Sequence, residues 1–98
     1  IALGMNEYCM YTAEVRISDA ATTPVYITNR RLIVEGGKHV DVPVPQIDDV
    51  IVDADTFRVT IRASELKRPL EFLAGEPIYL AAMLDLATRL DQRPKSFA

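Results

Sequence analysis

The stretch PIYLAAMLDLATRL, residues 77–90, decides the fold, because its apolar residues recur with a helical period. Pro77 suits the first turn of a helix, where its missing N–H is not needed, and Pro94 prevents the helix from continuing. The broad apolar face of this helix consists of Tyr79, Leu80, Met83, Leu84, Leu86, Ala87 and Leu90. A face that broad must be buried against a large surface, such as an open sheet or barrel. We therefore expect one C-terminal amphipathic helix over about residues 77–91.

The residues before this helix, about 9–73, show the two-residue period of short strands. The clearest alternation places Phe57, Val59, Ile61 and Ala63 on one face of a strand. The other expected strands are 9–17, 25–28, 32–34, 40–44, 47–52 and 70–73. The sequence thus predicts a mainly β, α+β fold: a small antiparallel β-barrel of six to seven strands, capped by one C-terminal helix.

Three turn signals define the connections between these strands. Residues 18–24, SDAATTP, are small, polar and end in proline, which indicates a loop. Gly36 and Gly37 between two apolar runs predict a tight hairpin turn. Pro43 and Pro45 cannot donate ladder hydrogen bonds, so the strand at 40–44 is expected to lie at an edge of the sheet or to end there.

Length and composition limit the function classes. The 98 residues predict a single domain, and because the first residue is Ile1, we interpret the chain as a piece of a longer protein. The net charge of −3 argues against nucleic-acid binding, which depends on Lys and Arg neutralising phosphates. The one cysteine cannot form an internal disulfide, which fits a reducing, cytoplasmic location. No apolar run approaches the length that a membrane span requires.

Three stretches together resemble the PH-like superfold, in particular its bacterial PH and GRAM-type branch. They are YITNRRLI at 26–33, VPVPQIDDV at 42–50, and the expected hairpin at 57–72 that precedes the helix. The resemblance implies a helix-capped barrel. PH domains that hold phosphoinositides usually carry Lys and Arg on the first two strands and the loop between them. Here that loop, 18–24, has no basic residue, so a phosphoinositide ligand is disfavoured.

Two basic sets are the candidate partner-binding patches. The first set is Arg58, Arg62, Lys67 and Arg68, and the second is Arg30, Arg31 and Lys38. Arg58 and Arg62 share the outward face of one strand, where Glu71 on the next strand could neutralise one of them by ordinary cross-strand pairing. Both interpretations remain open for each set.

The acidic residues of one stretch also allow two interpretations. They are Asp41, Asp48, Asp49, Asp53 and Asp55. They could attract a cation or a basic partner, or they could form a solvated, turn-rich surface. Their spacing does not match a calcium-binding loop. His39 is expected to be an exposed turn residue, and Cys9 a buried structural thiol.

The sequence contains no recognisable catalytic, cofactor-binding or metal-binding motif. It has no Gly-x-Ser-x-Gly segment and no glycine-rich loop before a helix. We therefore expect a non-catalytic interaction module, without a cofactor, that mediates protein–protein contacts or self-association in a larger cytoplasmic protein. Two alternatives remain: peripheral binding to membrane lipid, and binding of a small molecule at the barrel mouth.

Overall fold

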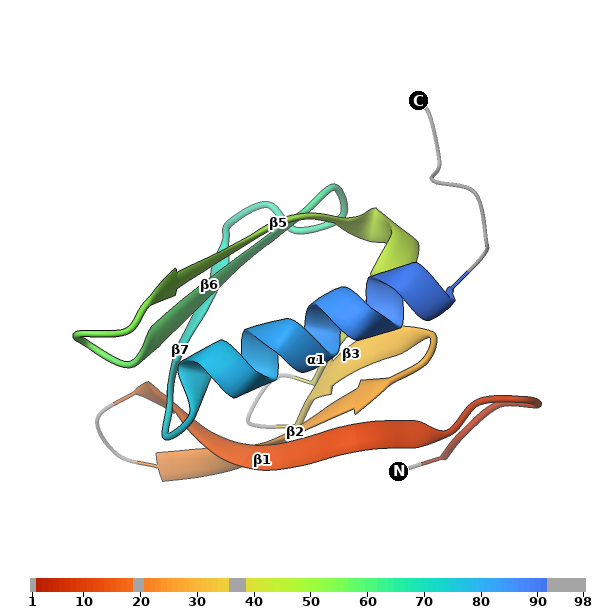
Figure 1. Cartoon of the computed structure of the whole chain (residues 1–98), viewed down its shortest axis with the longest axis horizontal. Coiled ribbons are helices and arrows are strands. Elements are labelled where there is room, and N and C mark those ends of the chain that lie inside the picture. The colour runs from red at the N-terminus through yellow and green to blue at the C-terminus, as the bar shows by residue number, and fades with distance from the viewer. Residues whose placement is uncertain (1, 19–20, 36–38, 92–98) are drawn as a thin grey trace.

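The computed structural model describes residues 2–18, 21–35 and 39–91 of the chain. Its elements in chain order are β1 Cys9–Ser18, β2 Ala21–Thr28, β3 Arg31–Val34, β4 Val40–Pro43, the 3-10 turn η1 Val44–Gln46, β5 Ile47–Asp53, β6 Arg58–Ala63, β7 Leu70–Ala74 and the helix α1 Pro77–Leu90 (Figure 1). The helix occupies the residues that the sequence predicts, and the mainly β, α+β fold class with one C-terminal helix is confirmed.

The seven strands form one antiparallel sheet in the order β4-β3-β2-β1-β7-β6-β5. The order ends at β4 and β5, so the prediction that the proline-containing strand lies at an edge is confirmed. Strand β1 bends the sheet because it pairs with β2 along its length but with β7 only near its C-terminal end. The β1–β4 and β5–β7 parts therefore lie on different sides of α1 (Figure 1).

Helix α1 fills the space between these two parts of the sheet. Leu80, Leu84 and Ala87 on its inner side have no solvent exposure. They belong to one apolar cluster with residues of both parts, such as Ile27 of β2 and Ile61 of β6. Burying each of the two leucine side chains stabilises the fold by about 1.5–3 kcal/mol, so α1 is an integral part of the core.

The β1–β2 connection is shorter than the sequence indicates. The loop expected at 18–24 is wrong, because β1 continues to Ser18 and β2 already begins at Ala21. Thr22 and Thr23 pair with Arg16 and Val15, as their β-branched side chains favour. Residues 19–20, which join the strands, lie outside the described part of the chain.

In the strand region, Phe57 and Cys9 were expected inside the protein but lie at its surface. Phe57 was expected to begin the inward alternation of β6, but it lies in the preceding turn with φ of 59° and is 53% exposed. Val59, Ile61 and Ala63 are buried as expected. The prediction of a buried Cys9 is also wrong, because a register shift between Cys9 and Tyr11 interrupts the inward alternation and leaves the thiol exposed.

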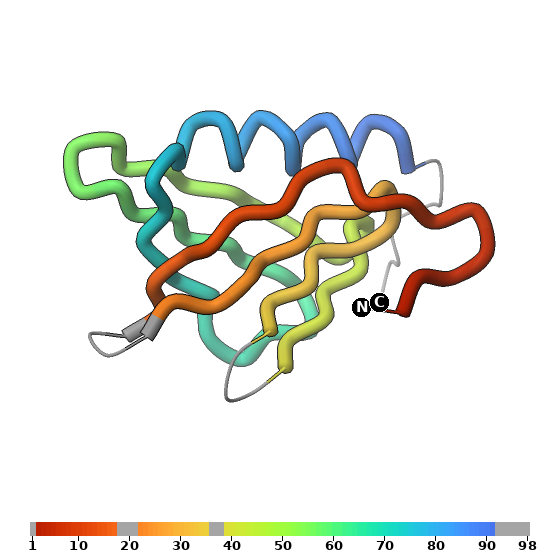
Figure 2. The backbone as a smooth tube through the Cα atoms, turned by 90° about the horizontal axis from the view of Figure 1, so that it is seen from below, coloured from red at the N-terminus to blue at the C-terminus, as the bar shows by residue number. Residues whose placement is uncertain are grey.

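Both views place the β5–β6 turn at the end of the molecule where α1 begins (Figure 2). The backbone explains this proximity: the Ala74 N–H donates to the Phe57 carbonyl at 2.9 Å, shortly before the helix starts. Residues 17 positions apart in the sequence thereby become neighbours. The expected Gly36-Gly37 hairpin turn lies outside the described residues, although β3 and β4 pair antiparallel as a hairpin requires.

Candidate interaction surface

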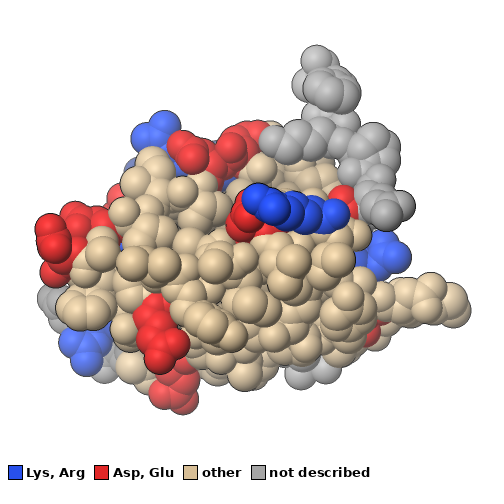
Figure 3. Space-filling view, in the orientation of Figure 1, with Lys and Arg blue, Asp and Glu red and all other residues tan. Residues whose placement is uncertain are grey.

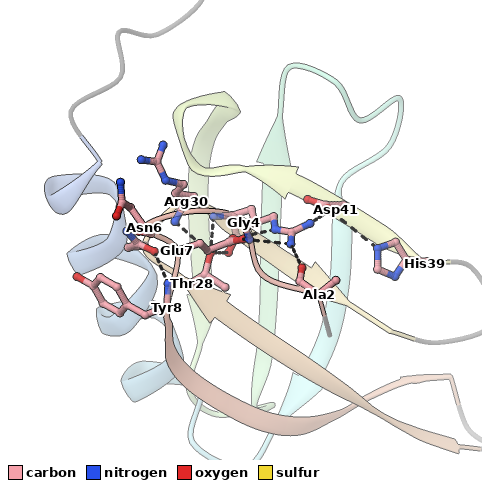
Figure 4. Close-up of polar contacts among 11 residues, drawn as sticks. Ala2, Gly4, Asn6, Glu7, Tyr8, Thr28, Arg30, His39 and Asp41 are labelled. Atoms are coloured by element: carbon pink, nitrogen blue, oxygen red, sulfur yellow. Dashed lines mark hydrogen bonds and ion pairs between the residues drawn. The ribbon is translucent and has the colours of Figure 1, made fainter.

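Arg31, which follows the β2–β3 turn, is the centre of a polar cluster. Figure 4 shows its partners Glu7, Asp41 and Ala2. Arg31 Nε donates to Glu7 Oε2 at 2.8 Å, and its two terminal nitrogens donate to Asp41 and to the Ala2 carbonyl. The Glu7 side chain is only 3% exposed. We call Glu7, Thr28, Arg31 and Asp41 the Arg31 cluster. Because it joins the N-terminal segment to β3 and β4, this cluster fixes that segment on the sheet.

Thr28 connects the turn to the cluster. Its hydroxyl donates to Glu7 Oε2 at 2.7 Å and accepts the backbone N–H groups of Arg30 and Arg31 at 3.0 and 2.9 Å. These bonds hold the β2–β3 turn against the end of β2. Asn29, the other turn residue, uses its side chain to bind the N-terminal segment, accepting from the Tyr8 N–H and donating to the Asn6 carbonyl.

The ionisation of Glu7 follows from these contacts. Burial alone would raise the pKa of this carboxyl group, but hydrogen bonds from Arg31, the Gly4 N–H and Thr28 outweigh burial and lower the pKa from 4.5 to about 2. The hydrogen bond to Glu7 also raises the pKa of Arg31. Both groups therefore stay charged near neutral pH, and neither is poised to exchange protons there. The cluster is suited to structural anchoring rather than to acid–base catalysis.

All four residues of the first basic set are exposed. Arg58 pairs with Glu71 at 3.1 Å, which is the cross-strand neutralisation that the sequence suggests. Arg62 is exposed on the same strand, and Lys67 and Arg68 are exposed in the connection to β7. In the second set, Arg31 belongs to the cluster, Arg30 is half-buried, and Lys38 lies outside the described residues.

The five aspartates of the acidic stretch lie in three places. Asp41 pairs with Arg31, and its Oδ2 lies 3.9 Å from Nε2 of the exposed His39. Asp48 and Asp49 border a cleft of about 430 Å³ between β5 and the C-terminal half of α1. Asp53 and Asp55 lie at the β5–β6 turn. Separation of the five carboxylates weakens the idea of a single cation site, and no group of three metal-ligating side chains occurs among the described residues.

The cleft between β5 and α1 is bordered by aspartates, and two of them make contacts within the chain. Asp85 and Asp91 border it from the helix side. Asp48 accepts a hydrogen bond from the Ser64 hydroxyl at 3.1 Å, and Asp85 pairs with Arg89 at 3.1 Å. These contacts stabilise the surrounding turn and helix.

The outer side of α1 differs from this cleft, because it exposes apolar groups. The expectation that the whole apolar face is buried is wrong: Tyr79, Leu86 and Leu90 are 54%, 42% and 47% exposed, and the neighbouring Ile78 is 65% exposed. We call these four residues the helix face. The only charged residues within α1 are Asp85 and Arg89, which form one ion pair. The side of the molecule that α1 occupies is mostly uncharged, with one basic and one acidic group side by side near its middle and acidic groups toward one end (Figure 3).

An apolar hollow of about 480 Å³ lies where α1 begins. It is lined by Phe57, Pro77, Ile78 and Tyr79, by two alanines and, as its one charged lining residue, by Glu76. We call it the Phe57 notch. Tyr79 is held there by Tyr11 of β1, with the ring centres 5.2 Å apart. Burial, with smaller contributions from Glu76 and Tyr79, raises the pKa of Tyr11.

Solved structures share this architecture. A DUF1696 family protein with a pleckstrin-homology domain from Shewanella loihica PV-4 aligns with a TM-score of 0.67 and 22% identity over 88% of this chain and 85% of its own. The fold of this chain is thus similar to that of a protein with a pleckstrin-homology domain. The C-terminal domain of an unknown protein from Leishmania infantum aligns with a TM-score of 0.66 and 12% identity over 89% of this chain and 88% of its own. At such identities the likeness concerns the fold alone. No family model and no curated protein sequence matches the chain.

The sequence could not identify several of these residues. Glu7 precedes the first expected strand and looks like an ordinary solvated acid, yet it is the buried partner of Arg31. A phenylalanine does not predict the positive φ that Phe57 adopts, because glycine and asparagine are the usual residues in that conformation.

In the described part of the chain, no helix is long and apolar enough to cross a membrane.

Proposed function

We propose that this domain is a non-catalytic interaction module that associates with a second copy of itself through the helix face. One observation carries the proposal: four large apolar side chains are exposed on a helix that bears only one ion pair. Soluble monomers rarely leave contiguous apolar patches exposed without a function for them. Covering these side chains would remove apolar surface from water at about 25 cal/mol per Å².

The charge pattern of α1 favours a second copy as the occupant. Asp85 and Arg89 have opposite signs and lie one turn apart. In a two-fold arrangement of antiparallel helices, Asp85 of each copy lies opposite Arg89 of the other, on either side of a contact centred near Leu86. An interface of this kind is complementary to itself in both shape and charge. A strongly charged partner would gain nothing from so neutral a surface.

We further propose that the domain acts within a larger protein in the cytoplasm. A role within a larger cytoplasmic protein fits the single cysteine, the acidic composition and the lack of a catalytic motif. The PH-like fold is compatible with this role, but it hosts many functions and does not choose among them. Lipid binding is less favoured, because the chain has a net charge of −3 and two of the candidate basic residues, Arg31 and Arg58, pair with carboxylates of the chain itself.

Sedimentation velocity over a range of protein concentrations tests self-association. The whole chain is expected to sediment faster as concentration rises, and Leu86→Glu is expected to remain monomeric because it places a carboxylate in the centre of the interface. Leu73→Glu is the matched control, since Leu73 is also exposed and apolar but lies on β7, opposite Arg58 and Arg16. A wild-type chain that stays monomeric at all concentrations, or equal effects of both variants, would contradict the proposal.

A further inference from the structure

The Phe57 notch has the chemistry of a receptor for one side chain. Apart from Glu76 its lining is apolar, and its volume of about 480 Å³ is ample for a bulky aliphatic or aromatic group. It is built on fixed elements: the helix start on one side and the hydrogen-bonded β5–β6 turn on the other. Hollows that combine apolar walls with a few polar groups at the rim are typical of binding sites.

The turn that forms one wall is not optimised for stability. Phe57 adopts a φ of 59°, a conformation that L residues with a Cβ rarely take, while the residue is 53% exposed. Glycine at this position would remove the steric cost. A bulky aromatic residue in such a conformation, with little burial to compensate, indicates that the ring is held at the surface for another reason.

Acidic side chains surround the notch. Glu76 lines it directly, and its side chain makes no capping hydrogen bond to the helix. Asp53 and Asp55 are exposed in the turn that leads to Phe57. The nearest basic residue in sequence, Arg58, is paired with Glu71. Acidic groups gather at this end of the molecule (Figure 3), so its rim attracts positive charge.

We propose that the Phe57 notch binds a short segment of a partner protein in which one bulky apolar side chain is flanked by lysine or arginine. The apolar side chain enters between Phe57 and the first turn of α1. The flanking cations lie near Glu76, Asp53 and Asp55, which supply orientation and faster association. The acidic rim thereby selects this segment over an acidic or neutral one of equal hydrophobicity.

This partner site shares Ile78 and Tyr79 with the helix face but does not include Leu86, the centre of the proposed contact between copies. Leu86 lies eight positions after Ile78, which is about 12 Å along a helix at 1.5 Å per residue. A two-fold contact centred near Leu86 therefore leaves the helix start accessible. Leu86→Glu removes the contact between copies without changing a residue of the notch, so this variant separates the two proposals.

Peptide titration followed by ¹⁵N–¹H correlation spectra tests the notch on the whole chain. The probe is a capped heptapeptide with one tryptophan between lysine pairs, KKGWGKK. It is expected to shift the amide signals around Phe57, Ile78 and Tyr79. Matched peptides with alanine in place of tryptophan, or glutamate in place of lysine, are expected to bind at least tenfold more weakly. Absence of localised shifts, or equal binding by the alanine peptide, would overturn the proposal.

Phe57→Gly separates binding from folding. If the ring serves recognition, this variant loses at least tenfold in peptide affinity while it unfolds at the same or a higher denaturant concentration. If the ring serves the fold, the variant unfolds at a lower concentration, which contradicts the proposal. Leu90→Ala is the matched control, because it removes an exposed apolar side chain from the far end of α1 and is expected to leave peptide affinity unchanged. Repeating the titration with Leu86→Glu shows whether the notch works without self-association.

Discussion

The Arg31 cluster and the helix face differ in how their side chains are exposed to solvent: the cluster buries a charged group, and the helix face exposes apolar groups. In the cluster, a carboxylate that is 3% exposed has its charge balanced by Arg31 and its oxygens bonded to Gly4 and Thr28. On the helix face, four apolar side chains remain 42–65% exposed. The cluster holds polar groups that folding has satisfied, whereas the helix face holds apolar groups that folding has left in water.

This difference separates residues that serve the fold from residues that are available to a partner. Charged residues are often the first candidates for a binding site, but here Arg31, Asp41 and Arg58 are paired within the chain. Association can still gain free energy by burying the apolar surface that the helix face exposes to water. Substitutions in the Arg31 cluster are therefore expected to change the free energy of unfolding more than substitutions on the helix face.

Arg31→Ala is expected to have the largest effect, because it leaves the buried Glu7 carboxylate without its counter-charge. Removing one partner of a buried ion pair typically costs about 3–5 kcal/mol, and the partial exposure of Arg31 places this variant at the lower end. Urea denaturation at neutral pH measures the loss. Arg62→Ala, an exposed control, should change stability by less than about 0.5 kcal/mol. Equal losses for the two variants would show that the cluster does not anchor the fold.

Acid should weaken the same cluster. The pKa of Glu7 is lowered from 4.5 to about 2 on folding, so its contribution is fully present above the unfolded value and is lost as pH falls from about 5 towards 2. A shift of this size corresponds to about 3 kcal/mol. Denaturation curves across this pH window should reveal the loss in the wild type and a much smaller one in Glu7→Gln. The same pH dependence in both proteins would assign it to other carboxylates.

Thr28→Val should have an intermediate effect, since it keeps the shape of the side chain and removes its hydroxyl. The N–H groups of Arg30 and Arg31 then lose their acceptor, and Glu7 loses a donor. Unsatisfied buried groups of this kind cost about 1–3 kcal/mol. Thermal unfolding of Thr28→Val and Thr28→Ser measures the effect, with the serine variant expected to retain most of the stability. A valine variant as stable as wild type would refute the role of the hydroxyl.

The smallest effect is expected on the helix face. Leu86→Ala should reduce the stability of the monomer by less than about 1 kcal/mol, whereas Leu84→Ala, two residues away on the buried side, should cost about 2–5 kcal/mol. Denaturation at low protein concentration makes this comparison without contributions from association. Similar losses would mean that the helix face is packed in solution, which would remove the reason to assign it to a partner.

The sequence predicts most of the fold because the governing signals are local. Periodicity locates α1 and the inward residues of β6, and the proline-containing strand correctly indicates an edge. Composition misleads at 18–24, where threonines that suit a strand are mixed with turn-forming residues. Strand alternation also fails at Phe57, where backbone conformation replaces the regular extended geometry.

The candidate surfaces were harder to predict, because they depend on distant residues. The partner of Arg31 comes from the N-terminal segment, 24 positions away. The notch combines a turn with a helix start that only the β6–β7 pairing brings together. Helical periodicity identifies the apolar side chains of α1 but not how many of them the sheet can cover. That number depends on the curvature of the sheet, which no local pattern encodes.

The most direct test of the central claim detects contacts between two copies of the chain. In a sample that mixes isotope-labelled and unlabelled protein, isotope-filtered nuclear Overhauser spectra report only intermolecular proximity. The account predicts cross-peaks that join the methyl groups of Leu86 and Leu90 to the helix face of the other copy, and their loss in Leu86→Glu. Intermolecular cross-peaks confined to another surface, or none at near-millimolar concentration, would contradict it.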